Sequence, residues 1–172
     1  MLILPGYGNS GPQHWQTLWQ QSDPDFERVQ QRDWDNPDCG EWCAALDAAA
    51  KRAGAGAVVV AHSIGCLVVA HWAAGAHAPI KAALLVAVPD PAGPAFPEEA
   101  SGFSVTPVQP FAFASMVVTS TDDPYGTADH ASRLANAWGS RVVNIGVRGH
   151  INADSGLGAW PDGYNLLTQL RD

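Results

Sequence analysis

The chain has 172 residues, of which 47% are hydrophobic and 15% are charged, a composition typical of a globular protein rather than a disordered one. Its formal net charge of −8 argues against a nucleic acid or an anionic membrane as partner, because both favour a basic protein surface. This length favours a single domain over residues 1–172 that buries a substantial core.

Cysteine content and the N-terminal segment bear on the compartment. Three cysteines, Cys39, Cys43 and Cys66, indicate a reducing compartment rather than a disulfide scaffold, and their spacing predicts no metal site. The N-terminal "MLILPGYG" has no basic segment and too short an apolar run for a signal peptide. No apolar stretch approaches the ~18 residues of a membrane span. We therefore expect a soluble cytoplasmic protein.

Strand and helix patterns alternate along the chain. Several of the predicted strands are apolar on both faces, which is typical of a parallel sheet covered by helices on both sides. The apolar spacing predicts, in chain order, a strand at 2–4, a helix at 14–20, a weak strand near residue 30, a helix at 40–53, a strand at 57–61, a helix at 64–76, a strand at 82–88, a proline-rich loop at 89–110, a strand at 114–119, a helix at 127–138, a strand at 141–147 and a helix at 162–171.

Residues capable of catalysis follow the predicted strands. In an open α/β sheet, active sites form beyond the carboxyl ends of the strands, near the point where the strand order reverses. Ser63 follows the third strand, Asp90 the fourth, Asp122 and Asp123 the fifth and His150 the sixth. The chain order Ser, Asp, His is that of a hydrolytic triad on such a sheet.

The segment "AHSIG" at residues 61–65 resembles a nucleophile elbow, with Ala61 at the position of the first glycine. The elbow is a tight strand-to-helix turn that needs small residues two positions before and after the serine. It would place the Ser63 hydroxyl at the top of the sheet. The alternative is a serine that only caps the following helix. The apolar strand before it and the Asp and His downstream favour a nucleophile.

His150 is the predicted base, because it follows the sixth strand and begins the polar loop "INADSG". His14 is a distant second candidate, since its loop also borders the site. His62 adjoins the nucleophile, but adjacent side chains leave the turn in different directions. The remaining histidines are predicted to be packing or surface groups on or near helices: His71, His77 and His130.

Three aspartates compete for the third catalytic position. Asp90 lies in the proline-rich stretch, whereas Asp122 and Asp123 follow the fifth strand, the commoner position for such an acid. Asp123 precedes Pro124, which restricts its backbone to extended conformations and suits a fixed hydrogen bond to an imidazole. Asp122 is then a neighbour that helps to shape the turn or faces solvent.

An oxyanion hole requires two amide donors near the nucleophile. Ile64, directly after Ser63, provides the first. The second is predicted to come from the glycine-containing loop "PGYGNSGP" after the first strand, with Tyr7 as the first choice and Gly8 as the alternative. Taken alone, this loop would be an ordinary glycine-rich turn, and it lacks the pattern of a phosphate-binding loop.

Over almost its whole length the chain resembles the compact α/β-hydrolases of the YdeN and retinoblastoma-binding-protein-nine serine hydrolase family. The resemblance rests on the segments "PGYGNSGPQHW", "AHSIG", "STDDPY" and "GHINADSGLGAWPDG". It implies about six parallel strands in the order 2-1-3-4-5-6, helices on both faces, no large lid domain and no cofactor. By position it places the nucleophile on Ser63, the acid on Asp123 and the base on His150.

The sequence therefore predicts a serine hydrolase that cleaves a small ester-type substrate, a carboxylester or a thioester, through an acyl-enzyme. Peptide bonds suit the same triad. The alternative is a protein-binding module on a hydrolase scaffold with weak or no catalysis, and a protein partner stays open. Trp15, Trp34 and the segment 89–111 are candidates for the acyl pocket, although core packing is the stronger expectation for both tryptophans.

Overall fold

The computed structural model describes residues 1–171. Strands and helices alternate along the chain as the apolar patterns predict. The elements are β1 (Leu2–Leu4), α1 (Trp15–Ser22), β2 (Glu27–Arg28), α2 (Cys39–Ala53), β3 (Val58–His62), α3 (Ile64–Ala73), β4 (Ala82–Val86), β5 (Ala114–Thr119), α4 (Ala128–Trp138), β6 (Arg141–Asn144), the short 3-10 helix η1 (Ala153–Ser155) and α5 (Pro161–Arg171).

Over residues 1–171 the strands form one six-stranded sheet in the order β2-β1-β3-β4-β5-β6. Every neighbouring pair is parallel. The chain moves outward from β1 to β2 and then returns to place β3 on the other side of β1, so the order reverses between β1 and β3. The predicted strand order is confirmed, and the reversal point lies beside Ser63.

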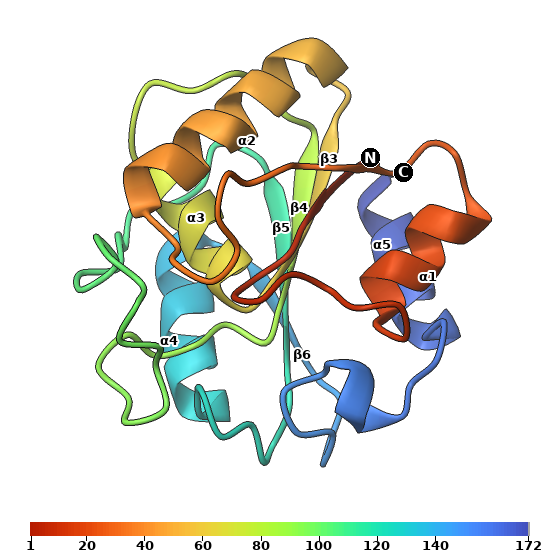
Figure 1. The fold of residues 1–172 in the computed structure, drawn as a ribbon, viewed down its shortest axis with the longest axis vertical. Helices are drawn as coiled ribbons and strands as arrows, with labels where there is room; N and C mark the ends of the chain where they lie inside the picture. Colours follow the sequence, from red (N-terminus) through yellow and green to blue (C-terminus); the bar gives the residue numbers. More distant parts are fainter. Residues whose placement is uncertain (172) are drawn as a thin grey trace.

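Helices cover both faces of the sheet, with α2, α3 and α4 on one side and α1 and α5 on the other (Figure 1). Trp42, Leu67 and Trp138 belong to the core on the first face. Trp15 and Leu167 belong to the core on the second. All five residues of β3 and of β4 are buried, which explains why these strands are apolar on both faces.

Several predicted elements are longer than those observed. The weak strand near residue 30 is only the pair Glu27–Arg28, and the helix predicted to end at residue 76 ends at Ala73. The fourth strand ends at Val86 because Ala87 has a left-handed backbone, with φ of 57°. The sixth ends at Asn144, whose side chain accepts a hydrogen bond from the Gly146 amide and closes a turn. The short helix η1 was not predicted.

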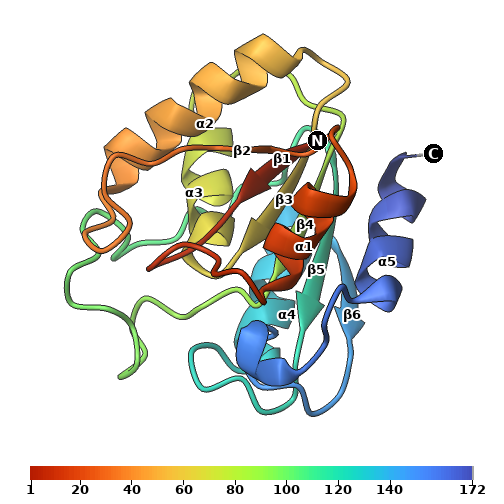
Figure 2. The same cartoon turned by 45° about the vertical axis from the view of Figure 1, so that its right-hand side comes forward.

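The carboxyl ends of the strands gather at one edge of the sheet. In Figure 2 the strand arrows point toward the lower part of the molecule, where the loops after β5 and β6 lie. The Ser63 turn between β3 and α3 opens toward the same edge. Within residues 1–171, every helix is too short or too polar to cross a membrane.

Candidate active site

Ser63 occupies a strained turn between β3 and α3. Its backbone has φ of 56° and ψ of −128°, a conformation that costs a non-glycine residue roughly 1–3 kcal/mol. Its side chain makes no capping hydrogen bond to α3. Gly65 makes the tight turn feasible, because a Cβ atom there would lie 2.5 Å from the Leu4 carbonyl oxygen. These features match a nucleophile elbow and not a helix cap.

Three side chains from different strand ends meet at this turn. The Nε2 atom of His150 lies 2.8 Å from Ser63 Oγ. Its Nδ1 atom lies 2.9 Å from each carboxylate oxygen of Asp123. A carboxylate only accepts hydrogen bonds, so Nδ1 carries the proton and Nε2 is left as an acceptor for the serine hydroxyl. His150 and Asp123 are both buried. The arrangement can move a proton from Ser63 to His150.

The structure gives the three candidate aspartates different partners. Asp123 contacts His150, and its Oδ1 also accepts a hydrogen bond from the Tyr125 amide, which fixes the carboxylate across Pro124. Asp90 instead lies 3.4 Å from His130, with its carboxylate Oδ2 facing the ring Nδ1. The Asp90 amide donates to the Tyr125 carbonyl, so this aspartate is well anchored but directed away from His150.

Asp122 turns its carboxylate to the loop after β6. It accepts hydrogen bonds from the Ser120 hydroxyl at 2.7 Å and from the amides of Arg148 and Gly149 at 2.8 Å each. The Ser120 hydroxyl, together with these amides, lowers the pKa of Asp122 from its ordinary 3.8. Asp122 thus shapes the turn while it stays exposed to solvent, so both roles that the sequence left open apply to it.

His14 and His62 form the wall beneath the base. The rings of His14 and His62 lie 4.7 Å apart, and those of His62 and His150 lie 4.9 Å apart. Burial, aided by the charge of Arg28 and by His150, lowers the pKa of His14 to about 4. Burial also holds the pKa of His62 well below its usual range. Both imidazoles are therefore neutral at neutral pH.

His14 has a structural role that the sequence did not reveal. Its Nδ1 accepts a hydrogen bond from the Gln16 amide and caps the first turn of α1. This leaves the proton of the neutral ring on Nε2, which is buried and has no partner among residues 1–171. A ring with its free proton on Nε2 and no contact to Ser63 is poorly placed to act as the base.

The loop after β1 lies directly against the nucleophile. A Cβ atom on Gly6 would fall 2.7 Å from Ser63 Cβ and 3.2 Å from the Ile64 nitrogen. The Gly8 amide donates to the Trp34 carbonyl and is therefore occupied. The Tyr7 amide makes no hydrogen bond among residues 1–171. Of the two predicted donors from this loop, Tyr7 is thus the one that remains available.

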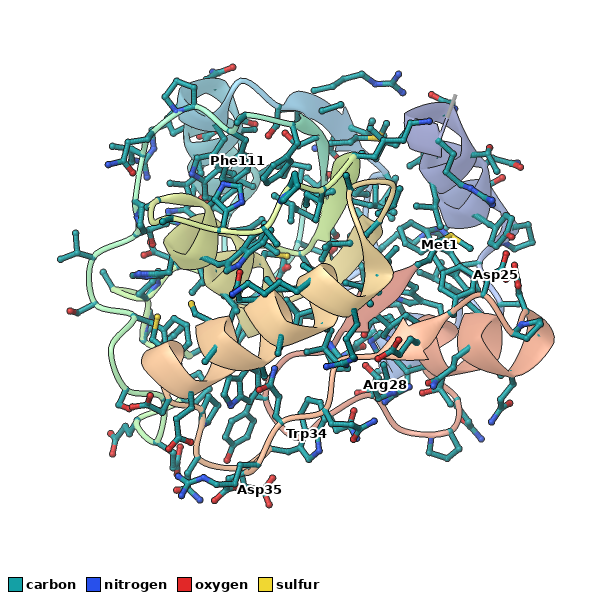
Figure 3. All side chains as sticks on the ribbon, turned by 90° about the horizontal axis from the view of Figure 1, so that it is seen from above. Met1, Asp25, Arg28, Trp34, Asp35 and Phe111 are labelled. Carbon is teal, nitrogen blue, oxygen red and sulfur yellow. The ribbon has the colours of Figure 1, made fainter. Side chains whose placement is uncertain are left out.

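A pocket of about 250 Å³ opens over Ser63. The segment 89–111 contributes only Pro89 and Pro97 to its walls, and neither Trp15 nor Trp34 lines it. Trp34 packs on Trp42 (ring centres 5.6 Å apart) and lies on the loop from β2 to α2 (Figure 3). The full lining is Tyr7, Asn9, Gly11, His14, His62, Ser63, Ile64, Pro89, Pro97, Tyr125, His150, Asn152 and Ala153.

Two tyrosines, Tyr7 and Tyr125, flank the pocket, and no role was predicted for Tyr125. The Tyr125 ring centre lies 4.4 Å from that of His150. Tyr7 is exposed, and the charges of Glu99 and Asp35 help to raise the pKa of its hydroxyl. These two carboxylates thus disfavour a further negative charge on Tyr7. The signals for Tyr125 are its place at the end of "STDDPY" and its position two residues after Asp123.

These features define an α/β-hydrolase fold. The sheet is parallel, a strained serine lies where its strand order reverses, and a histidine that is hydrogen-bonded to an aspartate faces this serine. The chain belongs to the serine hydrolase family, whose model matches residues 1–169. Membership of this family makes it a hydrolase and confirms the family resemblance inferred from the sequence. Comparison with curated proteins gave no match.

Solved structures agree with this assignment. A YdeN-like hydrolase from Pectobacterium atrosepticum is 27% identical, with 99% of this chain and 89% of that one covered and a TM-score of 0.87. The ydeN gene product from B. subtilis is 20% identical, with 98% and 96% covered and a TM-score of 0.80. An esterase domain from Rhodothermus marinus is 17% identical, with 99% and 85% covered and a TM-score of 0.70. The last two show the shared fold.

Proposed function

We propose that this hydrolase cleaves a small carboxylester or thioester through an acyl-enzyme on Ser63. The observation that carries the proposal is the 2.8 Å contact between Ser63 Oγ and His150 Nε2. The other ring nitrogen of His150, Nδ1, donates a hydrogen bond to Asp123. A serine alone is a weak nucleophile at neutral pH and needs an adjacent base of this kind.

The proposed reaction has two halves. His150 takes the hydroxyl proton as Ser63 attacks the carbonyl carbon, and the amides of Tyr7 and Ile64 stabilise the negative oxygen that forms. His150 then gives its proton to the leaving alcohol or thiol, and the acyl group stays on Ser63. In the second half, water attacks the acyl-enzyme with His150 again as base, and Ser63 is restored.

The substrate is proposed to be small. The pocket of about 250 Å³ is below the range of roughly 300–1,000 Å³ for sites that hold drug-sized ligands.

The alternative function, a protein-binding module without catalysis, has no observation in its favour. Binding through another surface would not require a serine in a strained backbone or its contact with a buried Asp–His pair. Both are costly features that a non-catalytic scaffold has no reason to retain.

A fluorophosphonate probe tests the proposal on the intact chain. We expect covalent labelling at Ser63, loss of labelling in Ser63→Ala, and loss of esterase activity by a factor of about 10⁴ in that variant. Ser104→Ala, which removes the hydroxyl of an exposed loop serine, is the matched control and keeps both. A folded wild-type protein that never labels would refute the proposed function.

A further inference from the structure

The loop that carries His150 has an unfavourable backbone on both sides of the histidine. Gly149 has φ of 54° and Ile151 has φ of 49°. Glycine adopts this left-handed region readily, but the branched side chain of isoleucine makes it a strained conformation. Without other contacts the loop would relax toward ordinary backbone angles. Because His150 lies between these residues, its imidazole would then move relative to Ser63.

Two buried side chains donate hydrogen bonds to the carbonyl groups of this strained segment. The Nε2–H group of His62 donates to the His150 carbonyl at 2.9 Å. The Nε1–H group of Trp15 donates to the Ile151 carbonyl at 2.8 Å. His62 ends β3 and Trp15 begins α1, so each donor belongs to a regular element and not to another loop. Consecutive carbonyls are thus held from two different elements.

The His62 ring has little freedom to adopt another orientation. It is buried and packs edge-on against His14 and His150. A carbonyl oxygen only accepts hydrogen bonds, so the proton of this neutral ring lies on Nε2. The side chain next to the nucleophile therefore reaches across the pocket floor and fixes the backbone of the base.

We infer that His62 and Trp15 are positioning residues that hold the loop 149–151 in its strained conformation and so keep His150 Nε2 within hydrogen-bond distance of Ser63 Oγ. The inference rests on the proposed function, in which His150 is the base. Neither side chain exchanges a proton with the substrate. Their effect is on the fraction of molecules in which the base is correctly placed.

The first experiment compares two His62 variants of similar size. His62→Leu removes the donor, whereas His62→Gln keeps an N–H group at a comparable distance from the backbone. We expect His62→Leu to slow fluorophosphonate inactivation and kcat for a small ester by about 10²-fold, with KM changed by less than about twofold, as loss of alignment predicts. His62→Gln should recover most of the loss.

The second experiment uses a matched pair of tryptophans. Trp15→Phe removes the donor to Ile151 and keeps an aromatic ring. Trp19→Phe removes a comparable donor, the Nε1–H group that donates to the Ala159 carbonyl at 2.6 Å, outside the strained loop 149–151. We expect Trp15→Phe to lower kcat by about tenfold and Trp19→Phe to leave kcat near the wild-type value, at similar losses in Tm.

The outcomes separate this inference from the proposed function. If wild-type protein labels at Ser63 but His62→Leu reacts as fast, or if both tryptophan variants lose kcat equally, the positioning role is refuted and the proposed function stands. If the wild-type protein does not label, both are refuted. Slow inactivation of His62→Leu with recovery in His62→Gln, together with a loss of kcat in Trp15→Phe but not in Trp19→Phe, supports the positioning role.

Discussion

The carboxylate of Asp122 accepts a 2.8 Å hydrogen bond from the amide of Gly149, the residue directly before His150. Its neighbour Asp123 instead contacts the His150 ring at Nδ1. Two adjacent aspartates thus act on one histidine in different ways, one through the backbone of its loop and the other through its imidazole. The pKa of Asp122 is lowered because its charged form accepts hydrogen bonds from the Ser120 hydroxyl and from the amides of Gly149 and Arg148.

Asp122→Asn should reduce the dependence of stability on pH. A lowered pKa in the folded state means that the ionised carboxylate stabilises the fold above pH 3.8, its ordinary pKa. That contribution is lost as the pH falls through the lowered value. We therefore expect wild-type Tm to exceed that of Asp122→Asn at pH 7, and the difference to shrink below pH 3.8. A Tm difference that stays constant across this range would contradict the assignment.

Asp123→Asn should lower kcat by roughly two to four orders of magnitude, because an amide in place of the carboxylate no longer fixes the Nδ1–H tautomer of His150. Asp90→Asn is the matched control, since its carboxylate faces His130, and it should cost less than about tenfold. The kcat values of the two variants with one small ester show which aspartate is the acid. A larger loss in Asp90→Asn would reassign the acid.

Much of the fold was predictable because its signals are local. Buried strands such as Val58–His62 are apolar at almost every position, and the small residues around Ser63 mark a tight turn. Strand ends were less predictable. Ala87 ends β4 with a left-handed backbone conformation, which an alanine side chain gives no reason to expect. This boundary depends on a tertiary contact, the hydrogen bond from the Ala87 amide to the Val118 carbonyl in β5.

The positions of Ser63, Asp123 and His150 in the chain pointed to one edge of the sheet, and their side chains meet there in the structure. The roles of His62 and Trp15 could not be predicted. Each depends on a backbone carbonyl 88 or 136 residues away in sequence, and the carbonyl group is common to all residues. Only the folded arrangement shows which carbonyls need a donor.

Gly6→Ala should disturb the proposed oxyanion hole. The added methyl group would lie 2.7 Å from Ser63 Cβ, too close for the loop after β1 to keep its position. Because Tyr7 follows directly, its amide should move away from the nucleophile. We expect kcat to fall by about 10²-fold, the cost of losing one oxyanion donor, with KM much less affected.

Gly56→Ala provides the control for this substitution. No atom lies within 4 Å of a Cβ placed there, and its backbone is not left-handed, so kcat should stay near the wild-type value. Steady-state kinetics on both variants, with circular dichroism to verify folding, make the comparison. Normal kcat in a folded Gly6→Ala variant would show that the loop after β1 is not part of the oxyanion hole.

Short acyl chains should be the preferred substrates, because the segment 89–111 adds little to the pocket. Pro89 and Pro97 line it, whereas Phe111 stacks on Trp138 with ring centres 5.1 Å apart, in the core on the α4 face. We expect kcat/KM to be highest for acetyl to butyryl p-nitrophenyl esters and about tenfold or more lower for octanoyl and longer esters, since a small pocket rejects added methylenes.

Pro97→Ala should shift this preference toward longer chains by removing part of the pocket wall. Pro107→Ala, in the same segment but away from the pocket lining, should leave the preference unchanged. The measurement is kcat/KM over an acetyl-to-palmitoyl ester series for wild type and both variants. If wild-type rates rise steadily from acetyl to palmitoyl, the pocket does not limit chain length, and the acyl group must lie along the surface outside it.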